Sequence, residues 1–350
     1  MITVTHLLDD TDLGGVTRFL DALETGLGDA VQQSRVVVSP RATVPPRLMD
    51  DIVVVHFTLS WAKLPFLLAL RARRGSNPIV LVEHSYSAAF ERKFVPRAAR
   101  FHAMLRLAYR LVDHVVSVSY GQAAWLRRAR LLPARKLSVI TPFTACEGLE
   151  QVPLPARRDS PLRLGAYGRF CAQKDFATLI AAMRHVDPAL ATLSIRGFGQ
   201  DLEQLEAEAK SLPHVTVGDR VDDLAAFLGD VDAIAVPSCF EPFGQVGLEA
   251  RLAGRPIIVS DVDGLPEQVE PDTGLIVPPE NPLALAEAIC ALADARSKGK
   301  LTALGQAARN HARGHVGVSV QRWLELLSSA LRLPASKPLI ASAKPAEGIS

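Results

Sequence analysis

The sequence predicts an α/β protein made of two doubly wound, Rossmann-like domains, and three observations support this fold class. The chain of 350 residues is long enough for two domains of ordinary size. Short apolar runs alternate with helix-length segments over most of its length, as in parallel α/β sheets. The alternation stops once, at residues 146–163, where three prolines stand among charged residues, so we expect a linker there.

The expected strands are mostly four to seven residues long, rich in Val and Ile, and bounded by Gly, Pro, Asp or Ser, as buried parallel strands are. They lie at residues 2–8, 35–39, 52–57, 79–83, 114–119 and 137–140 in the first half, and at 162–167, 191–196, 214–217, 233–237, 256–260 and 274–277 in the second. The helical patterns between them include 18–27, 175–185, 201–211, 222–228 and 282–292.

These elements predict an N-terminal domain over residues 1–150 and a C-terminal domain over residues 160–315. A last helical pattern, within residues 316–332, predicts a helix that crosses back to the first domain. Residues 333–350 are rich in Ala, Ser, Pro and Lys, so we expect a disordered tail.

The composition is typical of a globular protein, with 48% apolar and 22% charged residues. The four cysteines are far apart and lack CxxC spacing, so they predict neither a disulfide framework nor a zinc site. No basic segment precedes the first apolar run, and no run of 18 apolar residues occurs. We therefore expect no signal peptide and no transmembrane helix, and a cytoplasmic protein.

Basic residues are concentrated between Arg92 and Lys136, where Asp113 is the sole acid, although the net charge is only +2. A helical pattern at residues 94–111 places arginines among apolar side chains. Such a helix either docks on an anionic membrane, at its inner face, or is simply a solvated helix; both interpretations stay open. Docking would favour a lipid-linked acceptor. Nucleic acid is not an expected partner, because the stretch lacks an aromatic stacking platform.

Two glycine-rich or basic loops suit a pyrophosphate-bearing ligand. Gly14 and Gly15 follow the first expected strand and open a helix, where backbone N–H groups can approach an anion, although the spacing is not GxGxxG. Arg169 and Lys174 bring two cations to the carboxyl end of the first strand of the second domain. The plain alternatives are a tight turn for the glycines and solvated surface cations for the basic pair.

A third cluster pairs Glu241 with Glu249. Pro242 and Gly244 interrupt the segment, so Glu241 belongs to a loop and Glu249 to a helix that starts near Gly244. We expect Glu249 to accept hydrogen bonds from ribose hydroxyls and Glu241 to hold a sugar hydroxyl. The N–H groups that would point from the helix N-terminus at a phosphate belong to Gly244, Gln245 and Val246.

A fourth cluster consists of two loops expected at the same edge of the second sheet. One contains Gly197 and Phe198, and the other contains Arg220 and Val221. They are candidates for the walls of a nucleotide-base site, and ordinary turns are the alternative.

Together these motifs resemble the large family of retaining GT-B glycosyltransferases called family four, or glycosyltransferase group 1. The segment from Glu241 to Glu249 matches its E-x7-E signature, and the resemblance is strong over residues 162–292 and weaker in the first half. It implies two domains that face a cleft. It also implies transfer of a sugar from a nucleotide diphosphate sugar to an acceptor hydroxyl, with retention of configuration, as in polysaccharide or glycolipid assembly.

Carried over by motif, the resemblance implies that Arg169 and Lys174 bind the donor diphosphate and that Glu249 binds the ribose. In the family a histidine of the first domain contacts the donor sugar. His84 is the best match, His56 is its rival, and a structural histidine is the plain alternative. The transferred sugar and phosphates would be bound by Glu241, Phe243, Gly244, Gln245 and Val246, and from the opposite domain by Gly14 and Gly15.

The sequence departs from the family pattern at three places. Asp263 stands where the family often has a glycine, residues 141–144 replace a common Pro-Asn-Gly turn, and the first half is short, so we expect an altered phosphate loop and acceptor pocket. The Asp-Val-Asp segments ending at Asp232 and Asp263 imitate a metal-binding DxD motif, but the first leads into a strand, a common structural use of aspartate. Because Arg169 and Lys174 would neutralise the diphosphate, we expect no metal and no other cofactor.

Other functions remain open at this point. The same fold carries sugar-nucleotide epimerases and phosphorylases, which change the reaction. A non-catalytic nucleotide-sugar-binding subunit is a further alternative, although intact Arg169, Lys174, Glu241 and Glu249 disfavour it. The missing GxGxxG disfavours a dinucleotide dehydrogenase.

Overall fold

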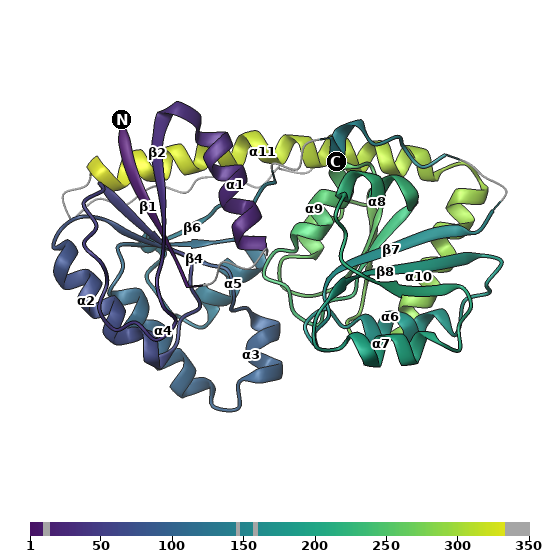
Figure 1. Ribbon diagram of the computed structural model, residues 1–350, viewed down its shortest axis with the longest axis horizontal. Helices are drawn as coiled ribbons and strands as arrows, with labels where there is room; N and C mark the ends of the chain where they lie inside the picture. The colour runs from purple at the N-terminus through teal and green to yellow at the C-terminus, as the bar shows by residue number, and fades with distance from the viewer. Residues whose placement is uncertain (10–14, 145–147, 157–159, 333–350) are drawn as a thin grey trace, which may run out of the picture.

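The computed structural model describes residues 1–9, 15–144, 148–156 and 160–332 and contains two domains, each built on a six-stranded parallel sheet. Figure 1 shows the two domains side by side, with helix α11 (Leu301–Arg332) running along both. The predicted fold class, two doubly wound α/β domains, is therefore confirmed. Within the described residues, no helix combines the length and the apolar character needed to cross a membrane.

The N-terminal sheet has the strand order β2-β1-β3-β4-β5-β6. Strands β3 and β4 are buried along their whole length because helices cover both faces of the sheet. The strands are β1 (Ile2–Leu8), β2 (Val31–Val37), β3 (Ile52–Val55), β4 (Ile79–Glu83), β5 (His114–Ser117) and β6 (Leu137–Val139), and the helices are α1 (Gly15–Leu27), α2 (Leu64–Arg74), α3 (Ala88–Phe94), α4 (Ala98–Arg110) and α5 (Tyr120–Arg128).

The C-terminal sheet has the Rossmann order β12-β11-β10-β7-β8-β9. Its strand order reverses between β7 and β10, and ligands of open α/β sheets bind at the carboxyl ends of the strands beside such a reversal. The strands are β7 (Leu162–Arg169), β8 (Ala191–Phe198), β9 (Val215–Gly218), β10 (Ala233–Val236), β11 (Ile257–Ser260) and β12 (Gly274–Val277), and the helices are α6 (Phe176–Met183), α7 (Leu202–Ala209), α8 (Leu224–Asp230), α9 (Gln245–Leu252) and α10 (Pro282–Ser297).

Helix α11 packs against α9 of the C-terminal domain and α1 of the N-terminal domain. Arg309 of α11 is buried and donates hydrogen bonds to three backbone carbonyls, at Val152, Leu252 and Ala253. These bonds tie the long helix to the linker and to the end of α9. A substituent on Gly305 would lie 2.3 Å from the Gly254 carbonyl, so only glycine allows this close approach.

Several predicted boundaries are wrong. The strand predicted at residues 35–39 spans Val31–Val37, because β2 is an edge strand whose polar, partly exposed residues lack a continuous apolar run. The last helix begins at Leu301 rather than near residue 316, although glycine is a poor helix former and three glycines lie within it. The helical pattern at 94–111 is divided between α3 and α4 around Pro96, which cannot continue a helix.

The Arg309 clamp predicts a large loss of stability on truncation. We expect Arg309→Ala to lower the free energy of unfolding by about 2–3 kcal/mol, because it leaves buried carbonyls without donors. Arg313→Ala is the matched control, since Arg313 and its ion-pair partner Glu150 are both about half exposed; we expect it to cost less than about 1 kcal/mol. Urea unfolding measures both, and equal losses would contradict the clamp.

Candidate active site between the two domains

Two carboxylates in the loop after β11 of the C-terminal domain accept hydrogen bonds from the N-terminal domain. Asp263 accepts from the Ser87 hydroxyl (2.7 Å) and the Ala89 amide (3.0 Å) at the start of α3. Glu267 accepts from the amides of Tyr120 (2.9 Å) and Gly121 at the start of α5. The loop after β11 therefore holds the carboxyl edges of the two sheets against each other.

The conformation and contacts of Asp263 explain why an aspartate can stand where the family often has a glycine. Its φ is +48°, in the left-handed region where glycine is the usual residue. A glycine could not replace the hydrogen bonds of the aspartate side chain. In addition to its bonds from the start of α3, this carboxylate accepts a hydrogen bond from the Glu241 amide (3.0 Å). The same residue thus joins the domains and positions the loop that carries Glu241.

Lys174 and Glu241 form a direct ion pair at the reversal of the C-terminal sheet. Lys174 follows β7 and Glu241 follows β10, the two strands on either side of the reversal. Glu241 is buried and also accepts from the Ser238 hydroxyl (3.2 Å). The structure therefore brings these two predicted residues together at the place where such sheets bind ligands.

Arg169 lies at the end of β7, with an exposed side chain that takes no part in the Lys174–Glu241 ion pair. Gly168, next to it, has a φ of +146°, and a side chain there would contact Lys174, with 3.7 Å to Cε. The two predicted cations are thus neighbours at one strand end, but only Lys174 is held in place by a carboxylate.

The N-terminus of α9 faces the N-terminus of α1. Gly244 precedes α9 with a φ of +89°, and Gln268 donates to the carbonyls of Phe243 and Gly244 (2.9 Å for the latter), which fixes this loop. A side chain on Gly15 would lie 2.9 Å from Gln245 Oε1, so the two helix starts approach closely. Within the described residues, neither amide atom of Gln245 has a hydrogen-bond partner.

Glu249 is fully buried on α9, and burial raises its pKa. Its Oε2 accepts from the Tyr167 hydroxyl (2.8 Å), and its Oε1 lies 3.6 Å from Arg18 Nε, which belongs to α1 of the other domain. Sequence reasoning missed Arg18. The available signal was its position one helical turn after Gly15, on the same face of α1.

The two loops predicted to wall a base site lie at the carboxyl ends of the neighbouring strands β8 and β9. Gly197 and Phe198 end β8, and the Phe198 ring is 47% exposed. Arg220 is exposed and 3.5 Å from Asp222, while Val221 packs partly into the core. Of the remaining predicted residues, Val246 is buried on α9, and Gly14 lies outside the described residues.

Three histidines of the N-terminal domain lie in a row. His84, just after β4, is partly buried, and its Nε2 lies 3.0 Å from His56 Nδ1. His56 is 5% exposed and lies behind it, next to the buried His6. Of the two rival histidines, His84 is therefore the one nearer the surface.

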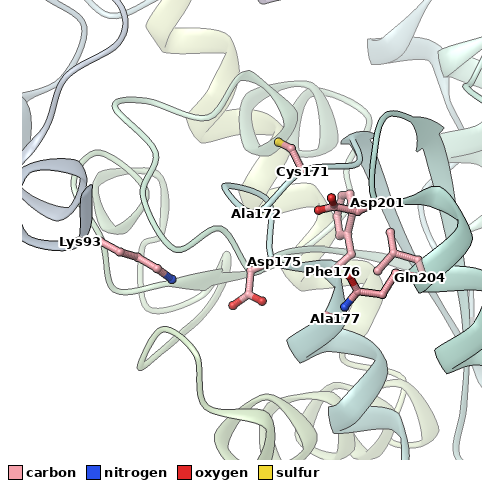
Figure 2. A pocket seen from close by; sticks show the side chains of 9 residues that line it. Lys93, Cys171, Ala172, Asp175, Phe176, Ala177, Asp201 and Gln204 are labelled. Atoms are coloured by element: carbon pink, nitrogen blue, oxygen red, sulfur yellow. The ribbon is translucent and has the colours of Figure 1, made fainter. Parts of the chain in front are cut away.

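A cavity of about 240 Å³ lies beside the loop that follows β7. Figure 2 shows side chains that line it, with Lys93 on one side of Asp175 and with Asp201 and Gln204 on the other. The carboxylates of Asp175 and Asp201 line it, together with Gln204. Neither Lys174 nor Glu249 lines it, and its two carboxylates do not suit an anion. It is therefore separate from the predicted diphosphate site.

Asp232 is a structural residue. It is fully buried and forms ion pairs with Arg163 (2.9 Å) and Arg296 (3.3 Å), which fits the structural use expected for the first Asp-Val-Asp segment. Within the described residues, no three His, Cys, Asp or Glu side chains group together as metal ligands would.

The buried histidines predict a loss of stability in acid. Burial lowers the pKa of His6 from 6.5 to about 4, so the unfolded chain binds this proton more tightly than the folded one. The free energy of unfolding is unaffected above pH 6.5 and falls as the pH drops from about 6.5 towards 4. In His6→Gln, the loss between pH 7.5 and 5 should be smaller by about 2 kcal/mol. Urea unfolding at both pH values tests this, with the exposed His185→Gln as control; equal losses in wild type and His6→Gln would contradict it.

Comparison with known proteins places this geometry in a family. A model described as Glycosyl transferases group 1 matches residues 161–295, and one described as Glycosyltransferase Family 4 matches residues 46–147. The lipopolysaccharide core biosynthesis glycosyltransferase LpsD of Rhizobium meliloti is 28% identical over 290 residues, which are 75% of this chain and 79% of that protein. D-inositol 3-phosphate glycosyltransferase of Salinispora tropica is 32% identical over 52% of this chain, but the match spans only 41% of that protein.

Solved structures agree on the fold. Anabaena HepE, in complex with UDP and glucose, superimposes with a TM-score of 0.74 at 18% identity, covering 94% of this chain and all of HepE. Sucrose-phosphate synthase of Thermosynechococcus elongatus gives a TM-score of 0.73 at 20% identity over 94% of this chain and all of that protein. With two facing Rossmann-like domains and both family models matched, the chain belongs to the group 1, family 4 glycosyltransferases of the GT-B fold.

Proposed function

We propose that the protein transfers a sugar from a nucleotide diphosphate sugar to an acceptor hydroxyl, with retention of configuration and without a metal ion. One observation carries this proposal. Lys174, Glu241 and the N-terminus of α9 meet at the reversal of the C-terminal sheet, and Gly15 faces them from the other domain.

The leaving diphosphate is the part of the donor that this cluster suits best. It gains negative charge as the anomeric bond breaks, so preorganised positive groups aimed at it lower the barrier. Lys174 supplies a compact charge, Arg169 a planar guanidinium, and α9 the positive end of its helix dipole. These groups would do the work that a divalent cation does in other transferases.

The nucleotide and the sugar are assigned to the residues around this centre. Glu249, whose Oε1 is beyond hydrogen-bond distance of Arg18, would accept from the ribose. Glu241 and His84 would hold the transferred sugar from opposite sides of the cleft. The base would lie against the loops of Phe198, Arg220 and Val221.

The interaction partners of Glu241 support retention of configuration. Its carboxylate is tied to Lys174 and Ser238, which suits a binding role rather than the free nucleophile of a double displacement. The acceptor would attack on the face of the leaving group, and a diphosphate oxygen would take its proton. Closure of the domains would exclude water and so suppress donor hydrolysis.

The acceptor is proposed to be lipid-linked, because the N-terminal domain has a surface suited to a membrane. Trp61 (43% exposed), Leu68 (60%) and Leu107 (43%) are exposed on adjoining elements: Trp61 just before α2, Leu68 on α2 and Leu107 on α4. The Arg100 guanidinium lies 5.7 Å from the Trp61 ring, and Arg110 is exposed on the same helix as Arg100. Exposed apolar side chains next to arginines favour binding to an anionic bilayer, such as the inner face of a membrane.

Donor binding provides the first test. A thermal-shift screen against UDP, GDP and ADP sugars, starting with UDP-glucose, should identify one that stabilises the protein by roughly 2.7 kcal/mol at 100 times its Kd. We expect Lys174→Ala to weaken the binding of that donor by about ten- to a hundredfold, because a charge-assisted hydrogen bond is lost. Lys210→Ala, an exposed lysine at the end of α7, is the control. Donor binding that is unchanged in Lys174→Ala, or abolished by EDTA, would refute this assignment.

Membrane docking is tested by flotation with vesicles that contain an anionic lipid. The wild type should float at low salt and be released at high salt, since each cation contributes about 1 kcal/mol. Arg100→Ser with Arg110→Ser should float less, while the control pair, Arg47→Ser with Arg184→Ser, should behave as wild type. If the wild type fails to bind anionic vesicles at low salt, the docking proposal is wrong.

A further inference from the structure

Four side chains form a hydrogen-bonded row across the N-terminal sheet, one from each of four neighbouring strands or strand ends. Gln33 lies on β2, His6 on β1, His56 just after β3 and His84 just after β4. Gln33 Oε1 is 3.1 Å from His6 Nε2, His6 Nδ1 is 2.9 Å from His56 Nε2, and His56 Nδ1 is 3.0 Å from His84 Nε2. The sugar-binding role proposed for His84 accounts for only the last of these residues.

The register of the sheet places the row on one face. Val4 pairs with Gln33, and His6, two residues on, pairs with Val54. His56 is two residues beyond Val54, and each further step is again an even number, so all four side chains point to the same side. The row climbs diagonally towards the carboxyl edge, beneath α1, where Phe19 contacts both His56 and His84.

The three imidazoles are neutral at physiological pH. Burial lowers the pKa of His6 and of His84 to about 4 and also lowers that of His56. A neutral imidazole has one N–H donor and one acceptor nitrogen. A row of neutral imidazoles therefore has a direction, in which every ring donates to the same side.

Gln33 sets that direction. Its amide nitrogen donates to the Leu23 carbonyl (3.4 Å) of α1, and a carbonyl can only accept. Gln33 Oε1 is therefore the atom that faces His6, and His6 Nε2 must carry the proton. His6 Nδ1 then accepts from His56 Nε2–H, and His56 Nδ1 accepts from His84 Nε2–H.

We propose that Gln33, His6 and His56 are positioning residues that hold His84 in the tautomer with an unprotonated Nδ1, so that His84 accepts a hydrogen bond from a sugar hydroxyl. A neutral acceptor nitrogen has no attraction for a phosphate oxygen, so the row would direct the hydroxyl-bearing part of the donor to this side of the cleft. The identity of that hydroxyl rests on the proposed function; the tautomer does not.

The tautomer is measured directly in the full-length protein labelled with 15N-histidine. Long-range 1H–15N spectra at pH 7.5 distinguish protonated from unprotonated ring nitrogens, and single His→Gln variants assign the signals. We expect Nε2–H and a bare Nδ1 in His6, His56 and His84. A proton on His84 Nδ1 in the wild type would overturn the proposal.

A variant series tests the source of the tautomer. Gln33→Met removes the terminal acceptor and should give His84 a mixture of tautomers, whereas Gln33→Glu keeps an acceptor and should preserve Nε2–H. Gln32→Met, an exposed neighbour on the opposite face of β2, is the control. If Gln33→Met leaves the His84 tautomer unchanged, Gln33 does not set it and the proposal fails.

Binding separates this proposal from the proposed function. The probes are UDP-glucose and UDP, or the matching pair if the screen selects another base. Gln33→Met should weaken the binding of the sugar nucleotide by roughly two- to tenfold and leave the binding of the bare nucleotide unchanged. Equal weakening of both would indicate general damage and contradict the positioning role. If no sugar nucleotide binds the wild type, the proposed function fails, while the tautomer spectra still decide whether the row is polarised.

Discussion

The carboxyl edges of two parallel sheets are held face to face, and the rest of the site depends on this constraint. Asp263 and Glu267, both in the loop after β11, accept hydrogen bonds from the first residues of α3 and α5 in the other domain. Both carboxylates are partly buried, and a carboxylate removed from water needs such donors to remain stable. Because these two carboxylates reach across to the N-terminal domain, Gly15 is brought opposite Gln245 at the start of α9.

Each of the two glutamates of the E-x7-E segment lies next to a basic side chain. Lys174 pairs with Glu241, and Glu249 is approached by Arg18 from the other domain. A diphosphate that binds here would compete with Glu241 for Lys174. A ribose hydroxyl would donate to Glu249 Oε1, which Arg18 approaches only to 3.6 Å. We infer that donor binding exchanges protein–protein pairs for protein–ligand pairs, so its affinity reflects the difference between the two sets.

Much of this could be predicted from the sequence, and the errors have physical causes. Buried parallel strands are Val- and Ile-rich runs, so the sequence predicts most of them close to their observed positions. The predicted position of the edge strand β2 is wrong by several residues because its exposed residues are polar. Lys174 and Glu241 follow strands of one sheet, so their convergence at its edge was predictable. Arg18 and the bridging role of Asp263 depend on how two domains pack, which no local pattern encodes. The histidine row was hidden because its members are far apart in sequence and only the strand register aligns them.

A structure with UDP, or with whichever nucleoside diphosphate the protein binds, tests the central claim most directly. The account predicts the β-phosphate within hydrogen-bond distance of Lys174 Nζ and of the first N–H groups of α9, with the ribose at Glu249. A diphosphate bound elsewhere, for example in the cavity lined by Asp175 and Asp201, with Lys174 still paired to Glu241, would contradict it.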